Sequence, residues 1–327
     1  TLGIVGLVGY LSYTSGQRSI QKLAYQLMAN VERQVSHELS SYLQQAPAFN
    51  QQIAAAMWAE VITPQDLDQL HRYLILQHQP AEDLTTLLFG SPEGDFLISH
   101  RVRPRDYGVT TRLTPLELPF EAAVSQSSNP QLNQTYAVDA AGNLGRYLET
   151  IINIDVRNRP WYRQTVETGE PGWTGPFQIA ATDHLALNAH QPLFDSAGEL
   201  IGVSAVNISL NQLSDMLRSI EVGASGQVLI LERDGQLIAT STAEEAYTTI
   251  GQPDLSGVSE PGNLVFERRS LDDISNPLLQ TAQQQLRATF GDFATLRSLQ
   301  QITFAVQGER YFLTIGPYSD EYGLDWL

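Results

Sequence analysis

The sequence predicts an α+β protein in which a long N-terminal helix precedes two modules built mainly from antiparallel strands. Between residue 15 and about residue 59, apolar residues recur every three or four positions, which is the spacing of one face of an amphipathic helix. Further along, two apolar segments flank a glycine-containing turn at residues 84–102, and the same arrangement returns at residues 228–240. Two such units this far apart indicate two similar modules rather than a short structural repeat.

The N-terminal segment is apolar. Residues 2–11 carry no charge, but they are too few to span a bilayer alone. Because the chain starts at Thr1, we interpret residues 1–13 as the C-terminal part of a transmembrane helix that begins upstream. A secretory signal peptide is the alternative, although its basic n-region and its small-residue cleavage pattern are missing.

Residues 14–60 are then expected to form a stalk helix. Its apolar face would pack along the globular part as an ordinary core helix, against a second copy of the chain in a homodimer, or both. We expect Pro47 to break or kink this helix, because proline lacks the N–H donor of a helix interior, and a further helical stretch to follow at residues 51–60. The next helix is predicted to open at Thr63-Pro64 and to run to about residue 77.

The first module is predicted to span residues 61–212. Its strands are expected at residues 84–89, 96–102 and 147–154, and in a hairpin at residues 185–194 and 200–208. Residues 103–146 are polar and contain several prolines, which predicts loops around a short helical patch. Long loops of this kind are often binding segments. A short helix over residues 161–168 and a turn over residues 173–177 complete the module.

The second module is predicted to span residues 213–327 and to be entered through a connecting helix at residues 210–220. The pair Asp234-Gly235 is a strong hairpin signal between strands at residues 228–231 and 237–240. A helix at residues 277–290 and a final hairpin, residues 302–306 with 311–315, follow.

The composition narrows the functional classes. A formal net charge of -17 over 327 residues would repel phosphate backbones and anionic lipid surfaces, so we expect no nucleic-acid partner. The chain has no cysteine, which excludes disulfides, thiolate metal sites and cysteine nucleophiles.

Residues that would indicate catalysis are sparse. The histidines show no metal-binding spacing, and no nucleophile-elbow or P-loop pattern is present. The acidic turns at Asp272-Asp273 and at residues 319–321 lack the ordered oxygen spacing of a calcium loop. We therefore expect no enzyme activity, no cofactor and no metal site in this chain.

The segment Arg157-Asn158-Arg159-Pro160-Trp161-Tyr162 has the composition of a ligand-binding corner. A planar guanidinium offers paired donors to a carboxylate, and Trp and Tyr supply apolar walls with a polar edge. The structural alternative is that Arg159 forms an internal pair while the two aromatic rings fill a core.

Together, several segments resemble the double Cache extracytoplasmic sensor domain. They are the apolar N-terminus, the stalk helix, the Arg159-Pro160-Trp161-Tyr162 corner, the hairpin around Gly198 that continues through residues 202–209, and residues 226–235. The resemblance covers nearly the whole chain and depends on the order and spacing of these segments. It implies two PAS-like antiparallel sheets stacked on a long helix, with a ligand held in the membrane-distal module, residues 61–212. It also implies a periplasmic position on a receptor of the bacterial cytoplasmic membrane, with a histidine kinase, chemoreceptor, cyclase or diguanylate cyclase as output.

A subset of this family binds amino acids or amines, and its pattern is only partly present here. The resemblance assigns the carboxylate contact to Arg159 and the aromatic wall to Trp161 and Tyr162. A later Tyr of the pattern is replaced by Phe177, and the Asp that pairs with the ligand ammonium is replaced by Asn207. Loss of that charge-assisted contact can cost about 1–3 kcal/mol.

Three interpretations of the ligand follow. Asp183 could supply the missing carboxylate, or the ligand could be an organic acid or neutral molecule without an ammonium group, or the motif could stabilise the fold without binding anything. The predicted function is ligand sensing. The alternative is a structural or dimerisation ectodomain, or a module that docks a periplasmic partner protein.

Overall fold

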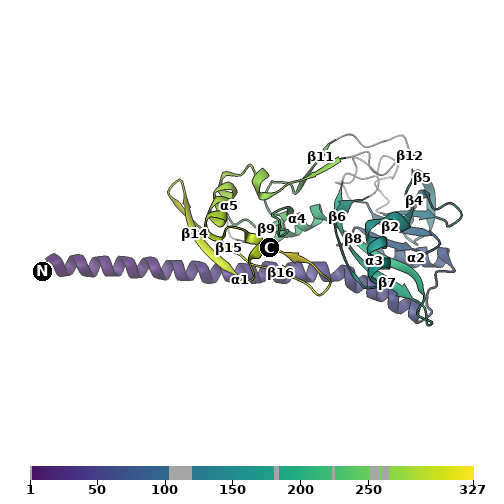
Figure 1. Cartoon of the computed structure of the whole chain (residues 1–327), viewed down its shortest axis with the longest axis horizontal. Helices are drawn as coiled ribbons and strands as arrows, with labels where there is room; N and C mark the ends of the chain where they lie inside the picture. Colours follow the sequence, from purple (N-terminus) through teal and green to yellow (C-terminus); the bar gives the residue numbers. More distant parts are fainter. Residues whose placement is uncertain (1, 103–119, 180–183, 223–224, 251–257, 260–264) are drawn as a thin grey trace.

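A computed structural model describes the chain except residues 1, 103–119, 180–183, 223–224, 251–257 and 260–264. A single rod-like helix, α1 (Leu2–Trp58), runs the length of the molecule, and two strand-rich bodies lie on it (Figure 1). The body formed by the C-terminal part of the chain covers the middle of the rod. The other body covers the C-terminal end of the rod. We call the body on the middle of the rod the proximal module and the body on its C-terminal end the distal module. Their boundaries at residues 61–212 and 213–327 remain predictions.

The stalk helix is longer and more continuous than expected. It passes through Pro47, so the predicted interruption and the separate helix after it are wrong. A proline inside a helix costs about 3 kcal/mol. Burial of neighbouring side chains in the main core, including Leu43, Ala46 and Ile53, offsets this cost. Within the described residues, no helix combines the length and the apolar character needed to cross a bilayer.

The distal module contains a nine-stranded sheet with the strand order β12-β5-β4-β3-β2-β1-β8-β7-β6. Neighbouring strands are antiparallel except for β12 and β5, which are parallel. The predicted hairpins at residues 84–102 and 185–208 are confirmed. The strands are β1 (Thr86–Gly90), β2 (Phe96–Arg101), β3 (Phe120–Ser125), β4 (Leu132–Val138), β5 (Leu144–Ile152), β6 (Gly172–Gln178), β7 (Leu185–Phe194), β8 (Leu200–Ser209) and β12 (Val258–Ser259).

Two predictions for this module are wrong. Strands β3 and β4 lie inside the segment 103–146, which was expected to be irregular, and residues 173–177 belong to β6 rather than to a turn. Strand β3 contains Glu and two Ala residues, and β4 contains Asn, and these residue types are infrequent in strands. Pairing with neighbouring strands overrides these weak local preferences.

Helices close the distal sheet. Helix α2 (Leu67–His78) begins after Asp66, whose side chain accepts a hydrogen bond from the Gln69 N–H group. Helix α3 (Pro160–Thr168) confirms the short helix predicted at residues 161–168 and ends at Gly169, which adopts the left-handed conformation. Helix α4 (Leu210–Ser219) follows β8 directly and carries the chain into the proximal module.

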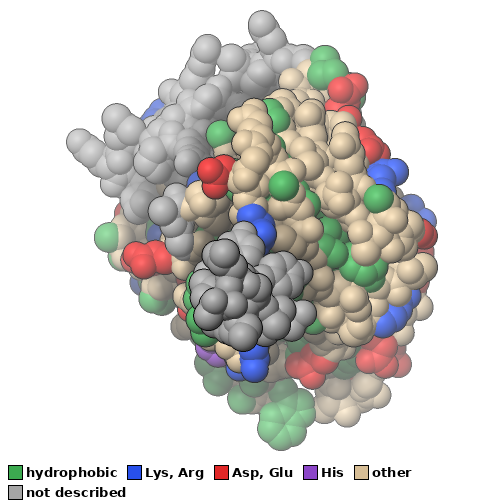
Figure 2. Space-filling model, turned by 90° about the vertical axis from the view of Figure 1, so that its left-hand side faces the viewer, with side chains coloured by type: hydrophobic (Ala, Val, Ile, Leu, Met, Phe, Trp, Pro, Cys, Tyr) green, Lys and Arg blue, Asp and Glu red, His purple; other side chains and the backbone are tan. Residues whose placement is uncertain are grey.

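The proximal module contains small antiparallel strand pairs and helix α5 (Pro277–Phe290), and both predicted hairpins of this module are confirmed. In Figure 2, which views the molecule from the N-terminal end of α1, acidic and basic side chains are interspersed over the described residues of this face. The strand pairs are β9 (Leu229–Leu231) with β10 (Leu237–Thr240), β11 (Tyr247–Ile250) with β13 (Val265–Arg268), β14 (Gln300–Val306) with β15 (Glu309–Ile315), and β16 (Tyr318–Ser319) with β17 (Asp325–Trp326).

Candidate ligand-binding site

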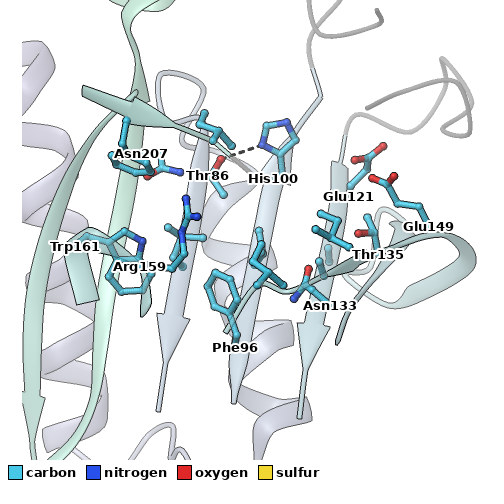
Figure 3. Close-up of a pocket in the computed structure, with 18 residues that line it drawn as sticks. Thr86, Phe96, His100, Glu121, Asn133, Thr135, Glu149, Arg159, Trp161 and Asn207 are labelled. Atoms are coloured by element: carbon cyan, nitrogen blue, oxygen red, sulfur yellow. Dashed lines mark hydrogen bonds between the residues drawn. The ribbon is translucent and has the colours of Figure 1, made fainter. Parts of the chain in front are cut away.

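A cavity of about 70 Å³ lies on one face of the distal sheet, between strands β8 and β1 to β5 and the segment that follows β5. A water-sized group needs roughly 10–15 Å³ on this scale, so the cavity has room for about five to seven such groups. Figure 3 shows its polar side chains, which come from several strands and from the start of α3. The charged and polar lining residues are Thr86, His100, Glu121, Asn133, Thr135, Glu149, Arg159 and Asn207.

Strand alternation places these side chains on one face. Successive residues of a strand point to opposite faces of a sheet, so residues two apart share a face. Asn133 and Thr135 of β4 follow this rule, as do Glu149 and Ile151 of β5. The residues between them point away from the cavity.

Arg159 reaches the cavity because the turn before α3 directs it there. It is the N-cap of α3 in an extended conformation, and Pro160 occupies the first helical position. Its Nη2 donates a hydrogen bond to the Gln178 carbonyl oxygen at 3.1 Å, and its Cζ lies 5.7 Å from the centre of the Phe177 ring. Burial lowers the pKa of the guanidinium. No carboxylate among the described residues forms an ion pair with it.

The neighbouring Arg157 has a different role. Its Nη2 lies 2.6 Å from Asp155 Oδ2, and Asp155 also accepts a hydrogen bond from the Arg157 backbone N–H group. This pair fixes the turn that precedes α3. Of the two arginines in the predicted corner, only Arg159 lines the cavity.

Of the two aromatic residues in the corner, only Trp161 lines the cavity. Trp161 is 1% exposed, lines the cavity and packs against Phe96, with ring centres 6.2 Å apart. Tyr162 is not a lining residue. Its ring lies behind the cavity wall beside Gly90, where an added Cβ would come within 3.1 Å of it, and burial raises the pKa of Tyr162 to about 12.

Phe177 and Asn207 both line the cavity. Asn207 lies on β8, and its Oδ1 accepts a hydrogen bond from Asn188 Nδ2 at 2.8 Å. The Asn207 oxygen is thus engaged within the protein, which leaves the N–H groups of this amide for the cavity. Asp183 lies outside the described residues.

The opposite end of the cavity carries carboxyl groups that the sequence analysis missed. Glu121 of β3 and Glu149 of β5 both line this end (Figure 3). Burial raises the pKa of Glu149 above its ordinary value of 4.5. Glu149 lies in the strand predicted at residues 147–154, but β3, which carries Glu121, and β4 were not recognised as strands. The alternation of side chains along them could otherwise have revealed this end of the cavity. Within the described residues, no group of three or more His, Cys, Asp or Glu side chains has the arrangement of a metal site.

A sheet on a long helix, with a small polar cavity in the distal module, defines a class of ligand-sensing domains. Comparison with known families agrees, because the family model described as Cache domain (dCache_1) matches residues 16–326. The chain belongs to the Cache domain family and is a ligand-sensing domain of a signal-transduction receptor. Cache domains of chemoreceptors are extracytoplasmic and are not enzymes.

Individual relatives are chemotaxis proteins. Methyl-accepting chemotaxis protein McpA of Pseudomonas putida is 29% identical over 96 residues, which are 29% of this chain and 15% of that protein. Methyl-accepting chemotaxis protein PctB of Pseudomonas aeruginosa is 27% identical over 96 residues, again 15% of its length. The solved structure called methyl-accepting chemotaxis protein X superposes with a TM-score of 0.51 at 15% identity, covering 94% of this chain and 96% of that one.

Proposed function

We propose that the distal cavity binds a small molecule through its carboxylate, and that the domain reports this ligand to the output part of a chemotaxis receptor. The observation that carries the proposal is the state of Arg159, a largely buried guanidinium without an ion-pair partner in the described part of the chain. A desolvated cation is costly to hold unless an anion compensates it. A ligand carboxylate would do so.

The surroundings of Arg159 suit a carboxylate with a short apolar body. The planar guanidinium can hold two carboxylate oxygens at once. Trp161 and Phe177 supply apolar walls, and the Asn207 amide offers further N–H donors. We leave Tyr162 out of the proposed contacts because it lies behind the wall.

The binding strand is joined to the stalk helix by buried hydrogen bonds. Asn50 of α1, 1% exposed, donates from Nδ2 to the Ala189 carbonyl oxygen at 2.9 Å. Ser204 of β8 donates from Oγ to Asn50 Oδ1 at 2.7 Å, and Asn207 follows on the same strand. If ligand binding shifts β8, these hydrogen bonds would transmit the displacement to α1. The ligand can bias this equilibrium only through different affinities for the two states.

We also propose that α1 pairs with a second copy of the chain and connects to the bacterial cytoplasmic membrane, with the sensor on the periplasmic side. Leu23 and Leu27, one helical turn apart, are 65% and 64% exposed. Apolar residues at this spacing form a stripe that a second helix can cover. Sedimentation of the protein should show a dimer that Leu23→Ser with Leu27→Ser weakens. A monomer at all concentrations would contradict this arrangement.

The carboxylate site can be tested by a thermal-shift screen against amino acids, amines, organic acids, purines and sugars. A ligand at about a hundred times its dissociation constant should stabilise the fold by roughly 2.7 kcal/mol. Arg159→Ala should abolish the shift caused by carboxylates. Arg163→Ala is the matched control, because Arg163 lies on the same helix but is exposed, and its ion pair in the described part of the chain is with Glu167, at 3.8 Å. Carboxylate binding that survives in Arg159→Ala would show that the cavity contact is wrong, and silence across the screen would favour a partner-docking role.

A further inference from the structure

We propose that Glu149, Asn133 and Thr135 bind a hard metal cation, with calcium the best fit, at the end of the cavity away from Arg159. The three residues lie on the adjacent strands β4 and β5, and each can offer an oxygen atom to the ion. This cation site is independent of the carboxylate ligand proposed for Arg159. The sequence alone predicted no metal site, because residues on paired strands leave no spacing motif.

Two buried oxygen atoms at this end of the cavity are available to a bound ion. Asn133 is fully buried and Thr135 is 5% exposed. Asn133 Nδ2 donates to Ser125 Oγ at 3.0 Å, but Asn133 Oδ1 and Thr135 Oγ1 have no hydrogen-bond partner among the described residues. Buried polar atoms are nearly always paired, because leaving one unpaired is costly. Both residues line the cavity, so an ion bound there can contact both oxygen atoms.

A carboxyl group lies next to these two oxygen atoms. Glu149 is the cross-strand neighbour of Thr135, and such neighbours have Cβ atoms about 4.5–5.5 Å apart. No cation in the described part of the chain pairs with Glu149, and burial raises its pKa. A metal ion would compensate the buried carboxylate. Glu121 of β3 brings a second carboxyl group to the same end of the cavity.

The spacing of the three residues suits one ion. Asn133 precedes Thr135 by two residues, so both side chains lie on the same face of β4. Asn133 is then the diagonal neighbour of Glu149, with Cβ atoms about 7 Å apart. Calcium lies about 2.3–2.6 Å from its ligand oxygens, so two of these oxygens can be about 5 Å apart. Side chains from these positions can therefore converge on one ion within two neighbouring strands.

The ligand atoms favour calcium over other metals. Carboxylate, amide and hydroxyl oxygens suit hard cations. Calcium accepts about six to eight oxygens in a flexible geometry, whereas magnesium demands a near-ideal octahedron that this mixed set does not offer. The cavity of about 70 Å³ has room for water molecules that complete the coordination. In Figure 3, Arg159 lies on the other side of the cavity from Glu149, which limits its repulsion of the ion.

Calorimetric titration of the whole chain with calcium chloride tests the site. A background of about 0.15 M sodium chloride screens the exposed charges of this acidic protein. We expect one calcium per chain, with a dissociation constant of about 0.1–1 mM, because the site supplies few charged ligands. Magnesium should bind about tenfold more weakly. Calcium should also raise the thermal unfolding temperature, since it binds only the folded chain.

Variants locate the ion. Glu149→Gln keeps the shape of the side chain but removes its charge, and it should weaken calcium binding by about tenfold or more. Thr135→Val removes one ligand oxygen and should weaken binding several-fold in a chain that still folds without calcium. Glu170→Gln, an exposed position outside the cavity, should bind calcium as wild type does. Arg159→Ala should also retain calcium, because Arg159 is not a ligand.

The outcomes separate the cation site from the carboxylate site. Calcium binding that is unchanged in Glu149→Gln would place the ion on the acidic surface and overturn the proposal. A wild-type chain without saturable calcium binding would also overturn it, and would assign Asn133 Oδ1 and Thr135 Oγ1 to bound water. Neither result affects carboxylate binding at Arg159. Failure of every carboxylate to bind would overturn the proposed function and leave the calcium site standing.

Discussion

The two modules treat buried charge in opposite ways. In the proximal module, Arg269 Nη1 lies 2.8 Å from Glu244 Oε2, and Arg268 and Arg233 pair with Glu232 and Asp325. In the distal cavity, Arg159 and Glu149 have no such partners among the described residues. The chain is therefore able to neutralise charge internally, and it leaves charge uncompensated at the cavity where a ligand can bind.

Two glutamates illustrate the difference. Hydrogen bonds from Ser275, together with Asn276 and Arg269, hold the pKa of Glu244 below its ordinary value. Burial without compensation raises the pKa of Glu149. The same side chain is a stabilising anion in one module and a costly one in the other. The charges of the proximal module thus stabilise the fold, whereas those of the distal cavity are available to a charged ligand.

The largest expected effect contrasts two arginines. Arg269→Ala should lower the free energy of unfolding by about 3 kcal/mol, because it leaves the largely buried Glu244 without its cation. Arg159→Ala should cost only about 1 kcal/mol, since it removes one hydrogen bond to Gln178 and no ion pair. Urea unfolding without ligand measures both. Equal losses would mean that Arg159 has an internal counter-charge and would remove the contrast between the modules.

The buried histidine His190 should make the stability of the distal module depend on pH. Burial lowers the pKa of His190 to about 4, while its Nδ1 shares a hydrogen bond with Thr165 Oγ1 at 2.8 Å. The unfolded chain takes up a proton near pH 6.5 and the folded chain does so only near pH 4, so stability is lost as the pH falls through this window. The expected loss is about 3 kcal/mol.

Comparison with His190→Gln isolates this contribution. Burial also lowers the pKa of His71, so some slope will remain in the variant. Urea unfolding at several pH values between 7 and 4 measures the difference between the two proteins. Parallel curves would show that His190 takes up its proton at the same pH in the folded and unfolded chain, so that burial does not lower its pKa.

The smallest expected effect is a gain in stability. Thr135→Val keeps the shape of the side chain and removes a buried hydroxyl oxygen without a partner among the described residues, so the unliganded protein should become about 1 kcal/mol more stable. A variant that is less stable without ligand would show that the hydroxyl already has a partner in the free protein.

Local sequence signals predicted much of the fold. The hairpins at β1 and β2, β7 and β8, and β14 and β15 have clear apolar segments around turn residues, and helix α5 has a proline start and a glycine end. Strands β3 and β4 and the continuity of α1 through Pro47 were missed. In each case packing or strand pairing overrides the local preference of the residues.

By itself, the sequence determined the fold class, the stalk helix and the corner that holds Arg159 and Trp161, because these depend on periodicity, turn chemistry and short-range spacing. Only the tertiary structure decided which side chains meet in the cavity. It placed Tyr162 behind the wall, turned Asn207 into a donor and brought Glu149 opposite Arg159. The physical reason is that a binding site is made by strands paired across the sheet, and no local pattern records which distant residues share one face.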